Sequence, residues 1–246
     1  MRRYDILTLF PGMVQGAIQE SILRRAQEKG LLEIRVINIR DYAVDKHRVV
    51  DDLPFGGGPG MILKPEPIFA AVRDCQRGHS EARVILMSPQ GSRFDQKMAQ
   101  ELVQEERLIF ICGRYKGVDE RVRQALVTDE ISIGDYVLSG GELPALVVVE
   151  ALARLIPGVL GDEESARSDS FYAGLLDHPH YTRPACFEGM EVPPVLVSGH
   201  HEQVRRWRRK EALRRTRERR PDLLSSVPLS DEDRQLLEEI EREGGN

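Results

Sequence analysis

The chain has 246 residues, of which 41% are hydrophobic and 30% charged, and its formal net charge is −5. This length suits one large domain or two smaller ones with a substantial hydrophobic core. No apolar run approaches the roughly 18 residues that a membrane helix needs, and no signal peptide precedes the first predicted strand, so we expect a cytoplasmic protein.

The first part of the chain has the pattern of a βαβ unit followed by a long polar loop. Pro11-Gly12 interrupts the alternation of the first strand, and Gly30 ends the helix as a C-terminal cap. We expect a strand over residues 4–10, a helix over 13–29 and a strand over 32–39. Residues 41–60 are too rich in Gly and Pro for regular structure, and a loop of this length is more often functional than not.

The alternation of helices and strands then continues, which predicts an α/β fold with a mostly parallel sheet and helices on both faces. We expect helices over residues 67–76, 95–106, 119–126 and 145–156, and strands over 83–87, 108–112 and 131–133.

Three of these strands end in turns rich in Gly, at residues 88–91, 113–117 and 134–141. If the strands are parallel neighbours, the turns share one edge of the sheet, where such folds bind ligands. Taken alone, residues 131–144 fit an ordinary strand-to-helix connection as well as a cofactor site. No turn carries a phosphate-loop or dinucleotide motif, which argues against ATP hydrolysis and against a standard dinucleotide site.

The chain changes character after residue 156. Residues 157–174 are acidic and rich in Ser, which predicts an interdomain linker, and the next ten residues are polar, aromatic and rich in Pro. His178 and His180 lack the spacing or Cys partners of a zinc site, so we expect no metal there. The three cysteines (Cys75, Cys112 and Cys186) are isolated, and we expect reduced thiols that serve in packing.

The C-terminal part predicts a small helical domain that binds a polyanion. Between His200 and Pro221 the chain has ten Lys or Arg and three Glu, which is +7, so the rest carries −12. A basic helix on an acidic body suits contact with phosphates, although a solvated helix face is the alternative. Ser230 and Asp233 predict a capping box for a last helix.

Motifs along nearly the whole chain resemble those of the bacterial tRNA (guanine-N1)-methyltransferases, which act at position 37 of tRNA and belong to the trefoil-knot (SPOUT) superfamily. The matching motifs are Leu9-Phe10-Pro11, residues 54–61, Ser88-Pro89-Gln90-Gly91, Cys112-Gly113-Arg114-Tyr115, residues 133–144, Ser168-Asp169-Ser170-Phe171 and Pro179-His180-Tyr181-Thr182-Arg183-Pro184.

The resemblance implies S-adenosylmethionine bound in a deep trefoil knot, which periodicity alone would not predict. It implies a knotted cofactor-binding domain over residues 1–156, a linker over 157–174 and a tRNA-binding domain over 175–246. The cofactor-binding residues it implies are Leu86, Met87, Ser88, Pro89, Gly113, Tyr115, Ile133, Gly134, Asp135, Tyr136, Val137, Leu138, Gly140, Gly141 and Pro144.

The resemblance assigns the chemistry to Asp169 and Arg154. Methylation at N1 of guanine requires a base that removes the N1 proton and a cation near O6. Without the resemblance, Asp169 would be interpreted as a solvated carboxylate and Arg154 as a surface arginine. We expect the substrate to order the linker, and a homodimer in which Asp169 of one subunit lies over the cofactor of the other.

The resemblance also implies a tRNA whose target base is flipped out of its stack. The expected RNA contacts are Ser165, Asp177, Arg183, Arg205, Arg208 and Arg209. Lys116 stands where the family is expected to have Glu, and because a cation would repel a sulfonium we expect it to face solvent or RNA. Mg²⁺ is implied as well, but no carboxylate cluster in the sequence locates it.

Two alternatives remain from the sequence. One is a knotted methyltransferase with another RNA target, such as a ribose 2′-hydroxyl, for which the base Asp169 would be unnecessary. The other is a non-catalytic RNA-binding protein with a relic pocket, against which the intact Arg154, Asp169 and glycine turns argue.

Overall fold

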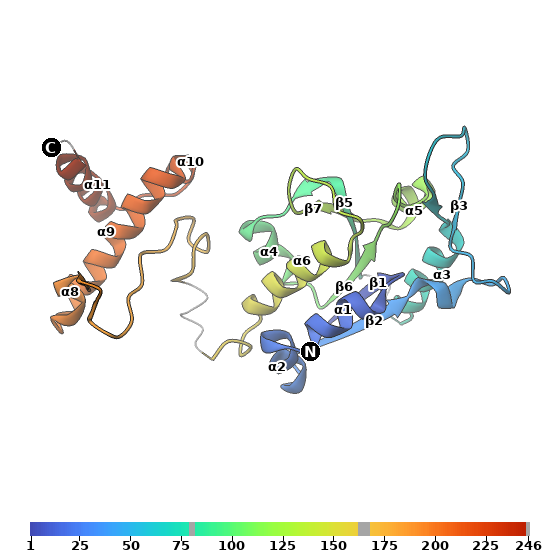
Figure 1. The fold of residues 1–246 in the computed structure, drawn as a ribbon, viewed down its shortest axis with the longest axis horizontal. Helices are drawn as coiled ribbons and strands as arrows, with labels where there is room; N and C mark the ends of the chain where they lie inside the picture. Colours follow the sequence, from blue (N-terminus) through green and yellow to red (C-terminus); the bar gives the residue numbers. More distant parts are fainter. Residues whose placement is uncertain (79–81, 162–167, 245–246) are drawn as a thin grey trace. The chain divides into compact units, whose positions relative to one another are not determined.

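The computed structural model describes residues 1–78, 82–161 and 168–244. The chain divides into two compact units, Met1–Asp162 and Glu163–Asn246, and each is considered by itself (Figure 1). Within the described ranges, no helix is long and apolar enough to cross a membrane.

A five-stranded parallel sheet forms the centre of the first unit, with the strand order β2-β1-β6-β5-β7. The strands are β1 (Arg2–Thr8), β2 (Leu32–Asn38), β5 (Arg83–Arg93), β6 (Arg107–Cys112) and β7 (Asp129–Ser132). Residues 84–87 of β5 and 108–112 of β6 are continuous apolar runs, as expected where both faces of a sheet are covered. The α/β fold with a parallel sheet is confirmed.

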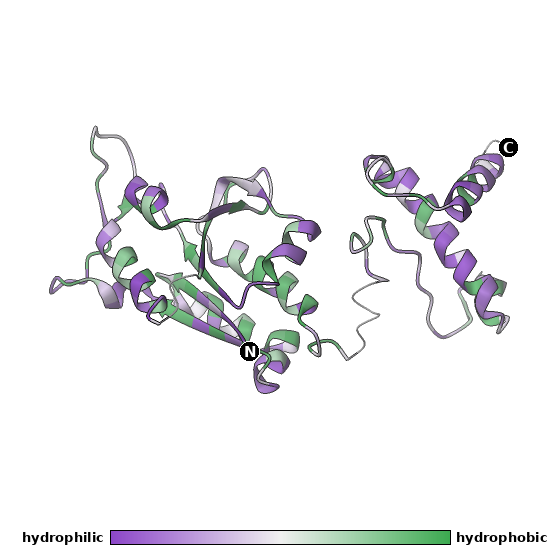
Figure 2. Ribbon diagram, turned by 180° about the vertical axis from the view of Figure 1, so that it is seen from behind, coloured by the Kyte–Doolittle hydropathy of each residue, from purple (hydrophilic) through white to green (hydrophobic). Residues whose placement is uncertain are grey.

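Helices cover both faces of this sheet, and each face has its own hydrophobic core. Successive side chains of a strand point to opposite faces, so Phe110 enters one core and Ile111 the other. The first core includes α1 (Pro11–Ile18), α2 (Ser21–Glu28), α4 (Gln96–Leu102) and α6 (Glu142–Leu155), and the second includes η1 (Ile39–Tyr42), α3 (Pro65–Cys75) and α5 (Glu120–Leu126). In Figure 2, hydrophobic colouring gathers in the sheet and α6.

Two elements differ from the sequence prediction. The helix expected over residues 13–29 is split into α1 and α2, and Ser21, where α2 begins, has a left-handed φ of 49°. The turn expected at residues 88–91 lies inside β5, whose register against β7 shifts between Met87 and Ser92. A Cβ on Gly91 would lie 2.3 Å from the backbone of Glu130, so only glycine allows this close approach.

The loop expected over residues 41–60 is closed at its base by two short antiparallel strands, β3 (Asp51–Asp52) and β4 (Ile62–Leu63). Between them, Gly56, Gly57, Gly58 and Gly60 all have positive φ, which accounts for the glycine-rich sequence.

The second unit is mainly helical. Its elements are β8 (Cys186–Phe187), β9 (Met190–Glu191), α8 (Pro194–Val197), α9 (His201–Arg219), α10 (Pro221–Leu224) and α11 (Asp231–Gly244). Its core is small and is formed by Leu175, Leu213, Leu236 and Ile240. The capping box is confirmed, because Ser230 Oγ accepts from the Asp233 N–H at 3.1 Å and the Asp233 carboxylate accepts from the Ser230 N–H at 2.9 Å.

The cysteines only partly match their predicted role. Cys75 and Cys112 are buried and pack in the two cores of the first unit, whereas Cys186 is exposed on β8. All three thiols are free.

Candidate functional site

The carboxyl ends of three neighbouring strands, β6, β5 and β7, lie at one edge of the parallel sheet. The loops that follow β6 and β7 contact each other there. The Gly141 N–H donates to the Gly113 carbonyl at 3.0 Å, and Arg114 forms an isolated antiparallel bridge with Gly140. Two of the three glycine segments singled out in the sequence, residues 113–117 and 134–141, are therefore brought together, at the place where parallel sheets bind ligands.

Two glycines make this contact possible. A Cβ on Gly141 would lie 2.7 Å from the Cα of Cys112, and a Cβ on Gly140 would lie 2.3 Å from the Arg114 side chain. Because backbone cannot move aside as a flexible side chain can, Gly141 has no substitute that leaves the two loops in place.

A buried ionic network, absent from the sequence predictions, connects these loops to β1. Glu142 is fully buried and accepts a hydrogen bond of 2.7 Å from the Thr8 hydroxyl, while the Arg114 guanidinium lies 3.2 Å from its other oxygen. Arg114 also lies over the ring of Phe10, 4.3 Å from its centroid. The sequence does contain a signal for this network, because Glu142 follows two glycines and begins an apolar helix. A carboxylate buried with such a helix requires a cationic partner.

The predicted cofactor residues differ in their exposure. Leu86, Met87 and Gly141 are buried, and Gly113, Ile133, Gly134, Gly140 and Pro144 are half-buried. Ser88 is half-buried, whereas Pro89 and Tyr115 are exposed, as are Asp135, Tyr136, Val137 and Leu138. The segment 135–138 is thus an exposed loop in which one aromatic and two aliphatic side chains follow Asp135, beside a buried edge that a ligand could cover.

The turn after β6 is tied to the glycine-rich loop. The Lys116 N–H donates to the Met61 carbonyl at 3.1 Å, and its exposed side chain runs along Gly60. A hydrogen bond with Asp51 raises the pKa of Tyr115, whose φ is 58°. The long loop is therefore part of the same site.

The two residues expected to perform the chemistry belong to different units. Arg154 lies in the last turn of α6 and is half-buried, whereas Asp169 is exposed in the second unit. Ser165, expected to contact RNA, lies outside the described residues.

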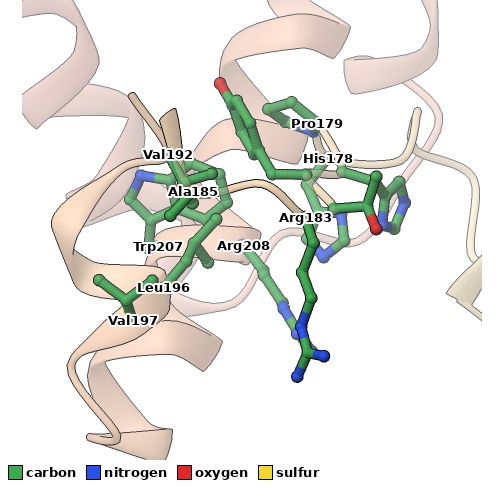
Figure 3. Close-up of a pocket in the computed structure, with 12 residues that line it drawn as sticks. His178, Pro179, Arg183, Ala185, Val192, Leu196, Val197, Trp207 and Arg208 are labelled. Carbon is green, nitrogen blue, oxygen red and sulfur yellow. The ribbon is translucent and has the colours of Figure 1, made fainter. Parts of the chain in front are cut away.

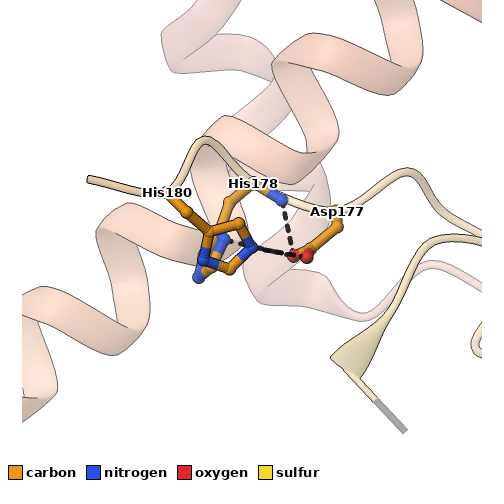
Figure 4. A group of neighbouring side chains, drawn as sticks. All are labelled: Asp177, His178 and His180. Atoms are coloured by element: carbon orange, nitrogen blue, oxygen red, sulfur yellow. Dashed lines mark hydrogen bonds and ion pairs between the residues drawn. The ribbon is translucent and has the colours of Figure 1, made fainter. Parts of the chain in front are cut away.

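In the second unit, Asp177 holds two histidines (Figure 4). Its carboxylate accepts from the His178 N–H and interacts with His180 Nε2, each at 2.7 Å, and His178 Nδ1 lies 3.1 Å away. Burial opposes ionisation of Asp177, but the bonds from both histidines outweigh it and lower its pKa. Burial lowers the pKa of His178. Potential ligand atoms of the three residues lie within 4.8 Å of one another, a grouping that helical spacing rules could not predict.

A pocket of about 380 Å³ lies beside this cluster (Figure 3). Its lining combines aromatic rings, apolar side chains, the Thr182 hydroxyl and two arginines, Arg183 and Arg208. Trp207 of α9 contributes its ring to this pocket.

The basic helix α9 is largely neutralised by α11. Arg205 pairs with Glu232 at 2.7 Å and Arg209 pairs with Asp233 at 2.6 Å. Further pairs follow the same seam: Arg206 with Glu239, Lys210 with Glu239 and Glu243, Arg214 with Glu243, and Arg217 with Glu241. Among the described residues, Arg183 and Arg208 have no carboxylate partner. The four arginines expected to contact RNA thus fall into a paired set and an open set.

Comparison with known proteins gives concordant results. A family profile described as tRNA (Guanine-1)-methyltransferase TrmD matches residues 2–226. A tRNA (guanine-N(1)-)-methyltransferase of Moorella thermoacetica is 63% identical over 245 residues, covering 99% of this chain and 98% of that protein. Proteins of the same name from Dictyoglomus turgidum and Geobacillus kaustophilus are 59% and 58% identical, and at least 98% of each chain is covered in both comparisons.

Proposed function

The chain belongs to the tRNA (guanine-1)-methyltransferase TrmD family, and we propose that it transfers a methyl group from S-adenosylmethionine to N1 of guanosine 37 in tRNA. The observation that carries the proposal is the meeting of the glycine loops at the carboxyl edge of the sheet, in a chain that matches the family over residues 2–226.

The proposed donor site is the edge formed by residues 86–89, 113–115 and 133–144. Three features support it: the backbone of the two glycine loops is within hydrogen-bonding distance, residues 135–138 are exposed, and the Arg114–Glu142 pair fixes the loops to the sheet. Backbone amides and carbonyls can contact an adenine and a ribose where no side chain intervenes. When bound, S-adenosylmethionine supplies an electrophilic methyl group on a sulfonium.

Asp169 is proposed as the general base and Arg154 as the group that balances charge. Neutral guanine carries a proton at N1, and its removal places negative charge on O6. A carboxylate can accept that proton, and a guanidinium can donate to the oxygen as charge develops there. The exposed position of Asp169 supports access to substrate.

The proposal includes the trefoil knot through residues 86–140 and a homodimer with composite sites, in which Asp169 of one subunit serves the donor site of the other. It also includes tRNA contacts by Asp177, Arg183 and Arg208, which is supported by the absence of a carboxylate partner for Arg183 and for Arg208 among the described residues and by their place in one pocket. Arg205 and Arg209 are proposed to act mainly through their pairs with α11.

Transfer of a radiolabelled methyl group to tRNA transcripts tests the function. We expect label in a transcript with guanosine at position 37 and none in the matched transcript with adenosine there, and nuclease digestion should yield 1-methylguanosine. Label recovered as a 2′-O-methylated nucleotide would support the ribose alternative. Binding of tRNA without any transfer would support the non-catalytic alternative.

A further inference from the structure

The pocket of the second unit has no assigned role. It lies between the segment 178–185, the helix α8 and one face of α9, and all twelve residues that line it belong to that unit. Its volume of about 380 Å³ falls in the range of small-ligand sites, about 300–1,000 Å³. Neither Asp169 nor Arg154 is among its lining residues.

Aromatic rings give this pocket flat surfaces. The Trp207 and Tyr181 ring centroids lie 6.4 Å apart, and those of Trp207 and His178 lie 6.3 Å apart. Asp177 fixes His178, and burial lowers the imidazole pKa, which favours the neutral ring at pH 7. Rigid aromatic surfaces of this kind stack on planar ligands.

The charge of the pocket is positive. Figure 3 shows the guanidinium groups of Arg183 and Arg208 directed to the same side of the pocket, and none of the lining residues is Asp or Glu. Arg205, Arg206, Arg209 and Arg214 of α9 have carboxylate partners on α11, whereas Arg183 and Arg208 have none among the described residues, so both are available to an anion. The Thr182 hydroxyl adds a donor and acceptor to the lining.

We propose that this pocket binds one extruded nucleotide of the tRNA, other than the methylated one, with its base stacked on Trp207 and its phosphate held by Arg183 and Arg208. The inference rests on the proposed function, since it takes tRNA as the ligand. The two guanidinium groups beside the histidines disfavour a metal ion in the neighbouring Asp177 cluster, whereas they suit a phosphate. A free nucleotide offers the same base and phosphate as a nucleotide of the tRNA, and the experiment below distinguishes these two ligands.

Trp207 is the only tryptophan of the chain, so its fluorescence reports on this pocket directly. We expect the tRNA transcript to quench the emission of the full-length protein, because a base stacks on the indole. Free GMP and AMP at the same concentration should not quench it, since they lack the contacts of the rest of the tRNA. Quenching by a free nucleotide that matches quenching by tRNA would overturn the assignment to an extruded tRNA nucleotide.

Transcripts with single abasic sites identify the occupant. We expect that removal of one base of the anticodon loop, away from position 37, restores the Trp207 emission while methyl transfer persists. If no such site restores it, or if tRNA is methylated without any quenching, the pocket proposal is wrong although the proposed function stands. Absence of methyl transfer to the unmodified transcript would instead contradict the proposed function. The quenching of Trp207 would still test binding of tRNA at the pocket, because it does not depend on methyl transfer.

Side-chain variants provide the second arm. Tyr181→Ala removes an exposed ring of the pocket, and we expect tRNA affinity to fall about tenfold, as for removal of a base-stacking surface. The matched control is Phe187→Ala, which removes an exposed ring of the same unit outside the pocket. Equal affinities for the two variants would contradict the proposal, and circular dichroism of both establishes that the unit is folded.

Discussion

Arg209 donates hydrogen bonds to both carboxylate oxygens of Asp233, at 2.6 and 2.9 Å, and so joins the most basic helix of the chain to an acidic one. Asp233 also accepts from the Ser230 N–H, so the same carboxylate caps α11 and pairs with α9. Asp233 therefore both caps the N-terminus of α11 and holds α11 against α9.

Asp233→Asn should destabilise the second unit by about 2 kcal/mol, because it removes a charge-assisted pair from a carboxylate that is almost fully buried. Urea unfolding followed by Trp207 fluorescence measures the decrease. Asp231→Asn is the matched control, since Asp231 is exposed and pairs within α11 with Arg234. Similar decreases in the two variants would contradict the assigned role of Asp233.

The stability contributed by Asp233 should depend on pH in acid. The Arg209 guanidinium holds the pKa of this carboxyl at about 2, below the ordinary 3.8. Since the folded-state pKa is the lower one, the contribution is complete above pH 3.8 and is lost as the pH falls toward 2. The difference in unfolding free energy between wild type and Asp233→Asn should shrink over this window. A difference that stays constant down to pH 2 would show that the shift is absent.

Arg208→Gln should reduce the salt dependence of tRNA affinity, because it removes a cation proposed to bind phosphate. The slope of log affinity against log salt concentration should fall by about 0.7–0.9 for each phosphate that the variant no longer neutralises. Arg205→Gln is the control with the same change of charge on the same helix, but its cation is paired with Glu202 and Glu232. We expect little change of slope for Arg205→Gln. A larger change of slope in Arg205→Gln than in Arg208→Gln would place the RNA surface on the opposite face of α9.

Gly141→Ala should weaken binding of S-adenosylmethionine at least tenfold, because the new Cβ forces the loop away from Cys112 and disturbs the hydrogen bond with Gly113. Calorimetric titration measures the affinity. Gly12→Ala is the matched control, since no atom lies within 4 Å of its added Cβ. Unchanged affinity in Gly141→Ala would place the donor site elsewhere.

Asp169→Asn should keep the affinities for the donor and for tRNA but lower the single-turnover rate of methylation by about 10²–10⁴, the usual contribution of a general base. Rapid-quench measurement with saturating enzyme isolates this step. The control Asp222→Asn removes another exposed carboxylate from the same unit. A wild-type rate in Asp169→Asn would exclude the base assignment.

Local pattern predicted much of the first unit. The apolar runs of β5 and β6 and the glycines after β6 and β7 are short-range signals, so the parallel sheet and the position of the glycine loops at one of its edges followed from the sequence. The continuous helix over residues 13–29 was wrong because the left-handed φ of Ser21 carries no clear composition signal.

Contacts between distant residues could not be predicted in this way. The net charge of residues 200–221 suggested an open basic surface, but the acids of α11 that neutralise it lie about 25–35 residues further along the chain. For the same reason, the burial of Glu142 against Thr8, 134 residues away, was missed, as was the pocket around Trp207.

The place of β1 within the sheet has a consequence for synthesis on the ribosome. This strand is the first to be made, and it lies between β2 and β6, with Arg3 paired to Arg107. At translation rates of about 5–20 residues per second, its second neighbour emerges about 5–20 s after it. During that interval one hydrogen-bonding edge of β1 has no partner, so the nascent first unit passes through a state that chaperones would shield from aggregation.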